Sequence, residues 1–168
     1  MKTSGFTLVR NGVAFDYPFE ESIRSLAAVV DEVVVNVGKS TDETYGRVKK
    51  ISEELGSHRF IIFESDWGLD NEEKKRGGKI LSEQTNLALD RCSYDWCVYL
   101  QADEVLSEKD ISSLKYKLDL ANSNHEVDGL VFDYIHFYGS FDVVQESRSA
   151  YRREVRAIRK SSHARSIG

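Results

Sequence analysis

Short apolar runs alternate with helical patterns along most of the chain, and this alternation constrains the fold more than any other feature. Strand-like runs lie in residues 5–12, 32–38, 59–63 and 96–100, and apolar residues at helical spacing follow each of them. Runs that are apolar on both faces are typical of central parallel strands, and strand–helix alternation predicts a parallel sheet between helices. The sequence therefore predicts an α/β domain.

The pattern changes near the C-terminal end. Residues 129–138 form one long alternating strand pattern, and residues 151–159 form a second, with no helical pattern between them. Neighbouring strands joined without a helix predict antiparallel pairing. We therefore expect a Rossmann-like three-layer sandwich with a mostly parallel sheet and an antiparallel extension at its C-terminal end.

Composition limits the class of protein. The chain has 168 residues, 40% of them hydrophobic, and a formal net charge of -5. This length predicts a single domain over residues 1–168, and the acidic balance argues against nucleic-acid binding, which needs a basic surface. No apolar stretch reaches the roughly 20 residues needed to span a bilayer, and no signal-peptide pattern opens the chain, so we predict a cytoplasmic protein. Cys92 and Cys97 are expected to be buried as small hydrophobic residues.

Two carboxylates, Asp103 and Glu104, follow the apolar run at residues 96–100. Ligands of open α/β sheets bind beyond the carboxyl ends of the strands, where a carboxylate is well placed to hold a divalent metal and, through it, a phosphate. The alternative is that the pair only starts a turn. Residues 107–110 supply a helix start of their own, so the turn does not require Asp103, and we predict a functional role for it.

A second candidate site lies around the third predicted helix, which begins at Lys79. Residues 64–78 form a long polar segment that ends in Gly77-Gly78. Backbone amides at a helix start favour an anion, and Arg76 and Lys79 would add positive charge. We predict that this segment becomes ordered over a bound nucleotide diphosphate; the alternative is that both basic side chains are simply solvated.

These features together resemble the nucleotide-diphospho-sugar glycosyltransferases of the GT-A fold, in particular family 2. The resemblance covers essentially the whole chain. The residues that carry it are Val9–Asn11, Ser40–Thr44, Gly78-Lys79, Asn86, Tyr99–Val105, His136–Ser140 and Tyr151–Arg156.

The resemblance implies transfer of a sugar from a UDP-, GDP-, CDP- or dTDP-linked donor to an unknown acceptor. Asp103 stands at the second acid of the family's DxD motif and would bind Mg or Mn, with Glu104 as a further metal ligand. Arg10, Asn36 and Asp42 would line the nucleoside pocket, and Lys79 would face the phosphates. The expected donor site comprises Val9, Arg10, Asn36, Asp42, Arg76, Lys79, Gln101, Ala102 and Asp103.

The sequence departs from the family pattern at three points. Gln101 replaces the first DxD acid, and Val37-Gly38 stand where the family has an acid at the end of the second strand. Gln101 can still hydrogen-bond a hydroxyl but brings no charge to a metal. The family's catalytic base and acceptor elements lie further along, so we expect a donor-binding portion truncated at its C-terminal end. Asp133 and Asp142 are the nearest acids, and each is more simply a surface or turn residue, so no base is assigned.

Two other functions remain open at this stage. A non-catalytic nucleotide-sugar-binding or interaction module would share the donor site without turnover. A nucleotidyltransferase would share the fold class and the metal carboxylate, but it should have a glycine-rich phosphate loop after the first strand, and Arg10–Val13 is not one.

Overall fold

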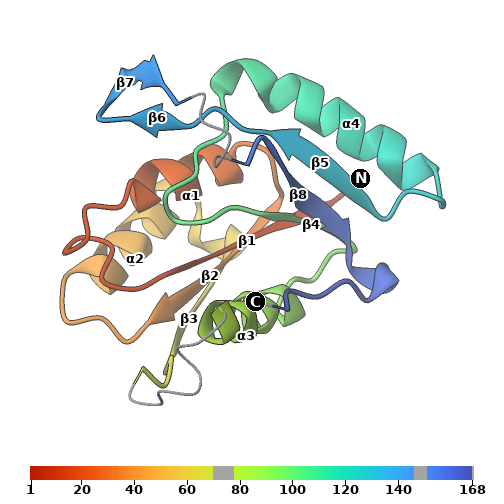
Figure 1. The fold of residues 1–168 in the computed structure, drawn as a ribbon. Coiled ribbons are helices and arrows are strands. Elements are labelled where there is room, and N and C mark those ends of the chain that lie inside the picture. Colours follow the sequence, from red (N-terminus) through yellow and green to blue (C-terminus); the bar gives the residue numbers. More distant parts are fainter. Residues whose placement is uncertain (70–77, 146–150, 168) are drawn as a thin grey trace.

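The computed structural model describes residues 1–69, 78–145 and 151–167, and Figure 1 shows their arrangement. A six-stranded sheet has the order β3-β2-β1-β4-β8-β5, and β6 and β7 form a separate two-stranded sheet. The elements in chain order are β1 (Thr3–Val9), α1 (Phe19–Ala27), β2 (Glu32–Gly38), α2 (Thr44–Leu55), η1 (Ser57–Arg59), β3 (Phe60–Ser65), α3 (Lys79–Asp90), β4 (Trp96–Tyr99), η3 (Glu108–Asp110), α4 (Ile111–Ser123), β5 (Gly129–Asp133), β6 (Phe137–Tyr138), β7 (Ser140–Val144), β8 (Arg153–Arg159) and η4 (Lys160–Ser162).

The sheet has a parallel half and an antiparallel extension, as the sequence predicted. β1 pairs in parallel with β2 and β4, and β2 pairs in parallel with β3. β8 then runs antiparallel to both β4 and β5. The predicted α/β fold class is therefore confirmed.

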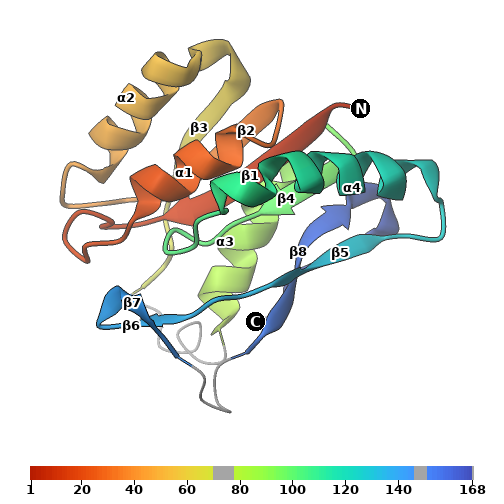
Figure 2. The same ribbon diagram turned by 90° about the horizontal axis from the view of Figure 1, so that it is seen from above.

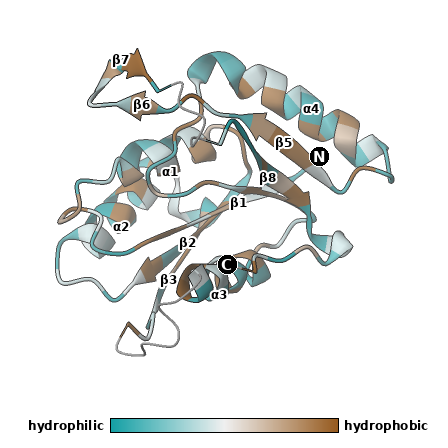
Figure 3. Ribbon diagram, viewed as in Figure 1, coloured by the Kyte–Doolittle hydropathy of each residue, from teal (hydrophilic) through white to brown (hydrophobic). Residues whose placement is uncertain are grey.

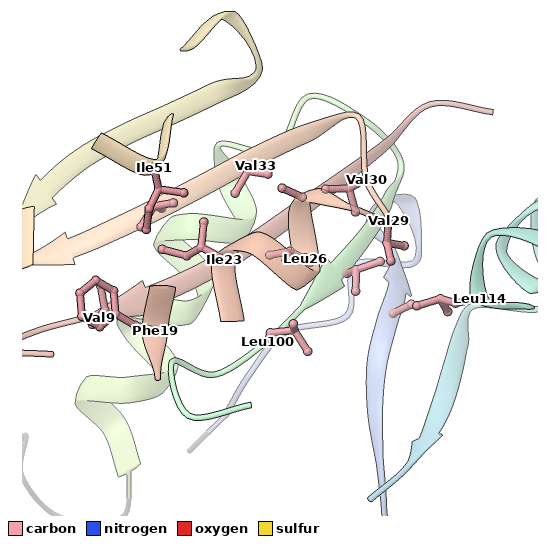
Figure 4. Packing of buried hydrophobic residues seen from close by; sticks show 14 of the residues in the cluster. Val9, Phe19, Ile23, Leu26, Val29, Val30, Val33, Ile51, Leu100 and Leu114 are labelled. Atoms are coloured by element: carbon pink, nitrogen blue, oxygen red, sulfur yellow. The ribbon is translucent and has the colours of Figure 1, made fainter. Parts of the chain in front are cut away.

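Two hydrophobic clusters hold the three layers together. The larger one joins α1, α2 and α4 to one face of the sheet, and Figure 4 shows part of it. The smaller one joins α3 to the opposite face, which matches the position of α3 in Figure 2, and it contains Cys92 and Cys97. Both cysteines are free and buried, as expected.

Strand alternation explains why both faces of β2 are buried. Val33, Val35 and Val37 belong to the larger cluster and Val34 to the smaller one, and all four are 0% exposed. Because successive side chains of a strand point to opposite faces, a continuous valine run supplies both layers at once. Each buried valine stabilises the fold by about 1.5–3 kcal/mol relative to an exposed one.

The prediction of one strand over residues 129–138 was wrong. β5 ends at Asp133, and β6 begins only at Phe137 and pairs with β7. β8, the neighbour of β5, starts at Arg153, and beyond Asp133 the Tyr134 amide still donates to the Arg152 carbonyl oxygen at 2.9 Å before the two segments separate. Gly139 adopts a φ of 73°, which is a conformation that glycine adopts readily, and this lets the chain turn back on itself as a hairpin.

Within the three described stretches, the helices are all too short or too polar to cross a lipid bilayer.

Candidate functional site

The loops after β1 and β2 lie together at the carboxyl edge of the sheet and are joined by hydrogen bonds. Arg10 Nε donates to the carbonyl oxygen of Lys39 at 3.0 Å. The Asn11 amide donates to Ser40 Oγ at 3.0 Å, and the Thr41 amide donates to Asn11 Oδ1 at 2.9 Å. Arg10 is half-buried and follows Val9, the last residue of β1. Its hydrogen bond to a backbone oxygen holds the side chain at this edge of the sheet.

Asp42 fixes the start of α2 to the loop after β1. Its carboxylate accepts hydrogen bonds from the amides of Ala14 at 2.8 Å and Thr44 at 3.0 Å, and from the Thr44 hydroxyl. Burial raises the pKa of Asp42, but the hydrogen bonds from Thr44 and Ala14 outweigh it and leave the pKa below its ordinary value. Both carboxylate oxygens are therefore used within the chain.

Asn36 lies in the interior and does not line an open pocket, in contrast to the role expected for it. It is 0% exposed, and its amide donates to the backbone oxygen and to Oε1 of Gln84 at 3.1 and 3.0 Å. Ser65 Oγ donates to Asn36 Oδ1 and closes the network. The reason is strand parity, because Asn36 shares with Val34 the face of β2 that packs on α3.

Trp67 covers the carboxyl end of β2, and sequence reasoning missed this. A Cβ built on Gly38 would lie 2.6 Å from Trp67 Cε2 and 2.8 Å from Arg10 Cβ. The indole ring thus occupies the space that a side chain at position 38 would need. Its Nε1 is buried and has no hydrogen-bond partner among the residues that the structure describes. The absence of an acid at Val37-Gly38 was the only sequence signal that something else fills this place.

The loop after β4 presents Asp103 to solvent. Ser22 Oγ on α1 donates to the Gln101 carbonyl at 2.9 Å, and the Leu106 amide donates to Ser25 Oγ at 3.1 Å. Both ends of the loop are thus fixed to α1, with Gln101 and Ala102 half-buried. Asp103 is exposed and makes no hydrogen bond or ion pair with any described residue, so its carboxylate can accept a ligand.

Glu104 is the internal anchor of the same loop. Its carboxylate accepts from Arg156 Nε at 3.0 Å, Arg156 Nη2 at 2.7 Å, the Tyr134 hydroxyl at 2.8 Å and the Gln101 amide at 3.0 Å. The Glu104 and Arg156 side chains are only 10% and 8% exposed. Burial raises the pKa of Glu104, but the Arg156 contacts and the other donors outweigh it and lower the pKa.

This arrangement differs from the expected role of Glu104 as a metal ligand. Both of its oxygens are already bound by protein donors, and a metal would have to displace a buried arginine. The side chain of Asp103 faces solvent. The side chain of Glu104 instead connects the loop after β4 to β8 and to the chain after β5.

An aromatic group lies beside Glu104 and consists of Tyr134, His136 and Tyr151. The ring centroids of Tyr134 and His136 are 5.7 Å apart, those of Tyr134 and Tyr151 5.1 Å, and those of His136 and Tyr151 4.7 Å. Arg156 lies over the Tyr134 ring with its guanidinium carbon 5.3 Å from the centroid. Burial and the hydrogen bond to Glu104 raise the pKa of Tyr134, so its hydroxyl remains a donor.

The predicted phosphate site is only partly described. Lys79 opens α3 directly after Gly78, which has a φ of 69°, and its side chain is exposed. Arg76 and most of the polar segment at residues 64–78 lie outside the described residues. The structure therefore places Lys79 at a helix start, as expected, and leaves the ordering of the segment as a prediction.

A metal at this edge would depend on Asp103. The described residues contain no group of three or more His, Cys, Asp or Glu side chains arranged to hold an ion. A single exposed carboxylate fits an ion whose other ligands are phosphate oxygens and water, which is how magnesium is often held at phosphate sites.

We compared the chain with family models, curated proteins and solved structures. No family model matches the chain, and no curated protein does. Solved structures do match. S. aureus TarS 1-349 shares 18% identity with a TM-score of 0.58 over 89% of this chain and 40% of that one. The chain has the GT-A glycosyltransferase fold.

Two further matches carry ligands. TarS 1-349 in complex with UDP shares 20% identity with a TM-score of 0.56 over the same shares of the two chains, 89% and 40%. Mannosyltransferase PcManGT from Pyrobaculum calidifontis, in complex with GDP-Man and Mn²⁺, shares 20% identity with a TM-score of 0.51 over 68% of this chain and 32% of that one. This GT-A-like chain thus spans about 40% or less of the length of these relatives.

Proposed function

We propose that the chain binds a nucleotide-diphospho-sugar and transfers the sugar to an acceptor, with Asp103 as the ligand of Mg or Mn. The observation that carries the proposal is the exposed carboxylate of Asp103, which has no hydrogen-bond or ion-pair partner in the described part of the chain and lies at the carboxyl edge of a GT-A sheet. The UDP complex of TarS and the GDP-Man and Mn²⁺ complex of PcManGT support a donor and an ion of these classes.

Different residues of the expected site would contact different parts of the nucleotide-sugar donor. Val9 and Arg10 at the end of β1, and Gln101 and Ala102 just before Asp103, would contact the nucleoside and the diphosphate. Asp42 shapes the neighbouring loop, while Lys79 and Arg76 would add charge to the phosphate side. Glu104 acts indirectly by holding the loop of Asp103 in place.

Sugar transfer from a nucleotide diphosphate depends mainly on neutralising the negative charge of the leaving group, and it needs no covalent bond to the protein. A divalent ion at Asp103 would offset the negative charge that grows on the departing nucleotide diphosphate. Asp103 would hold and orient the diphosphate through that ion, and Gln101 can hydrogen-bond a ribose or sugar hydroxyl.

A thermal-shift panel tests the donor site. UDP, GDP, CDP and dTDP are each added with Mn or Mg to the wild type, to Asp103→Asn and to Asp128→Asn, an exposed acid remote in sequence. A ligand at 100 times its dissociation constant stabilises the fold by about 2.7 kcal/mol. We expect one nucleotide to shift the wild type and the Asp128 variant only when metal is present. An equal shift in Asp103→Asn would exclude Asp103 as the metal ligand.

A donor-binding module without turnover is the second candidate, and the uncharged Gln101 at the place of an acid favours it. It predicts the same metal-dependent shift but no release of sugar from a labelled nucleotide-sugar. Glycosyl transfer predicts both.

A further inference from the structure

We infer that His136 is the general base that removes the proton from the acceptor hydroxyl. This inference rests on the proposed glycosyl transfer and adds the catalytic residue that the sequence did not identify. It follows from the way His136 is held within the aromatic group and from the position of that group beside the loop of Asp103.

The backbone of Tyr151 selects the tautomer of the neutral imidazole. His136 Nε2 lies 2.6 Å from the carbonyl oxygen of Tyr151. A carbonyl oxygen can only accept a hydrogen bond, so in the neutral ring Nε2 carries the proton and Nδ1 keeps its lone pair. Nδ1 has no hydrogen-bond partner among the described residues, and the side chain is half-buried. The ring therefore presents a basic nitrogen whose orientation is set by its other nitrogen.

The aromatic group is linked to the metal loop by direct contacts. The Tyr134 hydroxyl donates to Glu104, the residue after Asp103, at 2.8 Å. The Tyr134 ring packs on both His136 and Tyr151. Burial raises the pKa of the Tyr151 phenol, and the charge of Glu104 and, to a smaller extent, that of Asp103 add to the rise, so the charge of Asp103 also acts on Tyr151. These contacts join His136, through Tyr134, to Glu104 in the loop that carries Asp103.

Three acids of the same region, Glu104, Asp133 and Asp142, are paired with arginine or lie on another face. Asp133 pairs with Arg153 at 2.7 Å on the surface, and alternation along the strand points it away from the side of Tyr134. Glu104 is neutralised by Arg156. Asp142 is exposed on β7 of the hairpin. The other charged and titratable groups around the described part of the His136 segment are Tyr134, Tyr151, Arg152 and Glu154. Glu154 is half-buried on β8 opposite Phe132, so its carboxylate also lies in this region. Because an imidazole is ordinarily a stronger base than a carboxylate, His136 and not Glu154 is assigned as the base.

The step balances without any further reactant. The acceptor oxygen forms a bond to the anomeric carbon of the donor sugar while its proton passes to His136 Nδ1. The bond from the anomeric carbon to the diphosphate oxygen breaks, and its electron pair leaves with the nucleotide diphosphate. The imidazolium then returns the proton to solvent.

The test uses the nucleotide-sugar whose nucleotide gives the largest metal-dependent thermal shift, with water as the acceptor. Sugar release is measured for the wild type, for His136→Gln and for His125→Gln, a matched change at an exposed histidine in the loop before β5. General-base catalysis contributes about 10²–10⁴-fold. We expect His136→Gln to lose at least about 100-fold in rate with unchanged donor affinity and melting temperature, and His125→Gln to match the wild type.

Two measurements separate a base from a structural residue. Imidazole added to His136→Ala should restore part of the rate, whereas a residue needed only for packing would not be rescued. Long-range proton–nitrogen NMR of the wild type should show the Nε2–H form, which needs no turnover to observe.

An unchanged rate in His136→Gln, or a ring protonated on Nδ1 in the neutral state, would overturn the assignment while leaving donor binding intact. Absence of metal-dependent nucleotide binding in the wild type would instead overturn the proposed function, and the base assignment with it.

Discussion

The parallel half of the sheet and its antiparallel extension are built on different principles. Strands β1, β2 and β4 are buried along nearly their whole length. In Figure 3, hydrophobic residues colour parts of the sheet brown, and they also colour β7 of the β6–β7 hairpin. The β6–β7 hairpin is exposed along its whole length, even though it carries large aromatic residues. Tyr138 is 72% exposed and Phe141 is 84% exposed. The parallel half therefore builds the core, whereas the hairpin that follows β5 is free to carry exposed side chains.

The two regions meet at the Glu104–Arg156 pair. Glu104 comes from the loop after β4, and Arg156 comes from β8, with Tyr134 from the chain after β5 completing the contact. The proposed donor site lies on the parallel half and the proposed base on the extension. This buried pair therefore adds a side-chain link between the Asp103 loop and the Tyr134 segment to the backbone pairing of β4 with β8.

The largest expected effect comes from breaking that pair. Removing one partner of a buried ion pair costs about 3–5 kcal/mol, because the other charge stays buried and unpaired. We expect Glu104→Ala to lower the free energy of unfolding by that amount in urea. The control is Asp133→Ala, which breaks an exposed pair and should cost only about 0–1 kcal/mol. Similar losses in both variants would show that the two regions are not joined through Glu104.

Acid should act on the same contact. The pKa of Glu104 is lowered in the folded state, so its contribution is fully present above the unfolded pKa and is lost as the pH falls through the folded one. The gap in unfolding free energy between the wild type and Glu104→Gln should therefore shrink below about pH 4.3, the ordinary pKa of a glutamate. Urea titrations from pH 7 to pH 3 measure it, and a gap that stays constant would contradict the assignment.

A smaller effect is expected within the parallel half, at the end of β2. In Gly38→Ala, the new methyl group would overlap the Trp67 ring, and overpacking of this kind costs about 1–3 kcal/mol. Gly46→Ala is the control, because its nearest neighbour would be 3.5 Å away and alanine favours the α2 helix by about 0.5–1 kcal/mol. The two changes should move the melting temperature in opposite directions. A shift in Trp fluorescence only in Gly38→Ala would show that Trp67 has moved.

The sequence predicted the parallel half well and the extension less well, for physical reasons. Valine runs, helical spacing and glycine stops are local signals, and they placed β2 and the start of α3 correctly. The end of β5 at Asp133 depends on where its partner strand β8 begins, and this pairing between distant segments cannot be read from the local sequence. The same holds for the site: an exposed Asp103 followed from its place after β4, but the partners of Glu104 lie 30 and 52 residues away in the chain. Asn36 was expected in the nucleoside pocket, but it faces α3. The alternation of side chains along β2 already indicated this, because Asn36 is two residues from Val34 and shares its face.

The smallest expected effect is that of Val143→Ala in the hairpin, for which the same substitution at Val35 in the core is the reference. Val35 on β2 is 0% exposed, whereas Val143 on β7 is 50% exposed. Val35→Ala removes methyl groups from the core and should cost about 1.5–3 kcal/mol, while Val143→Ala should stay within about 0.5 kcal/mol. Urea unfolding of the two variants measures the difference. A loss at Val143 as large as that at Val35 would mean that the hairpin is packed against something in solution and is not an exposed region.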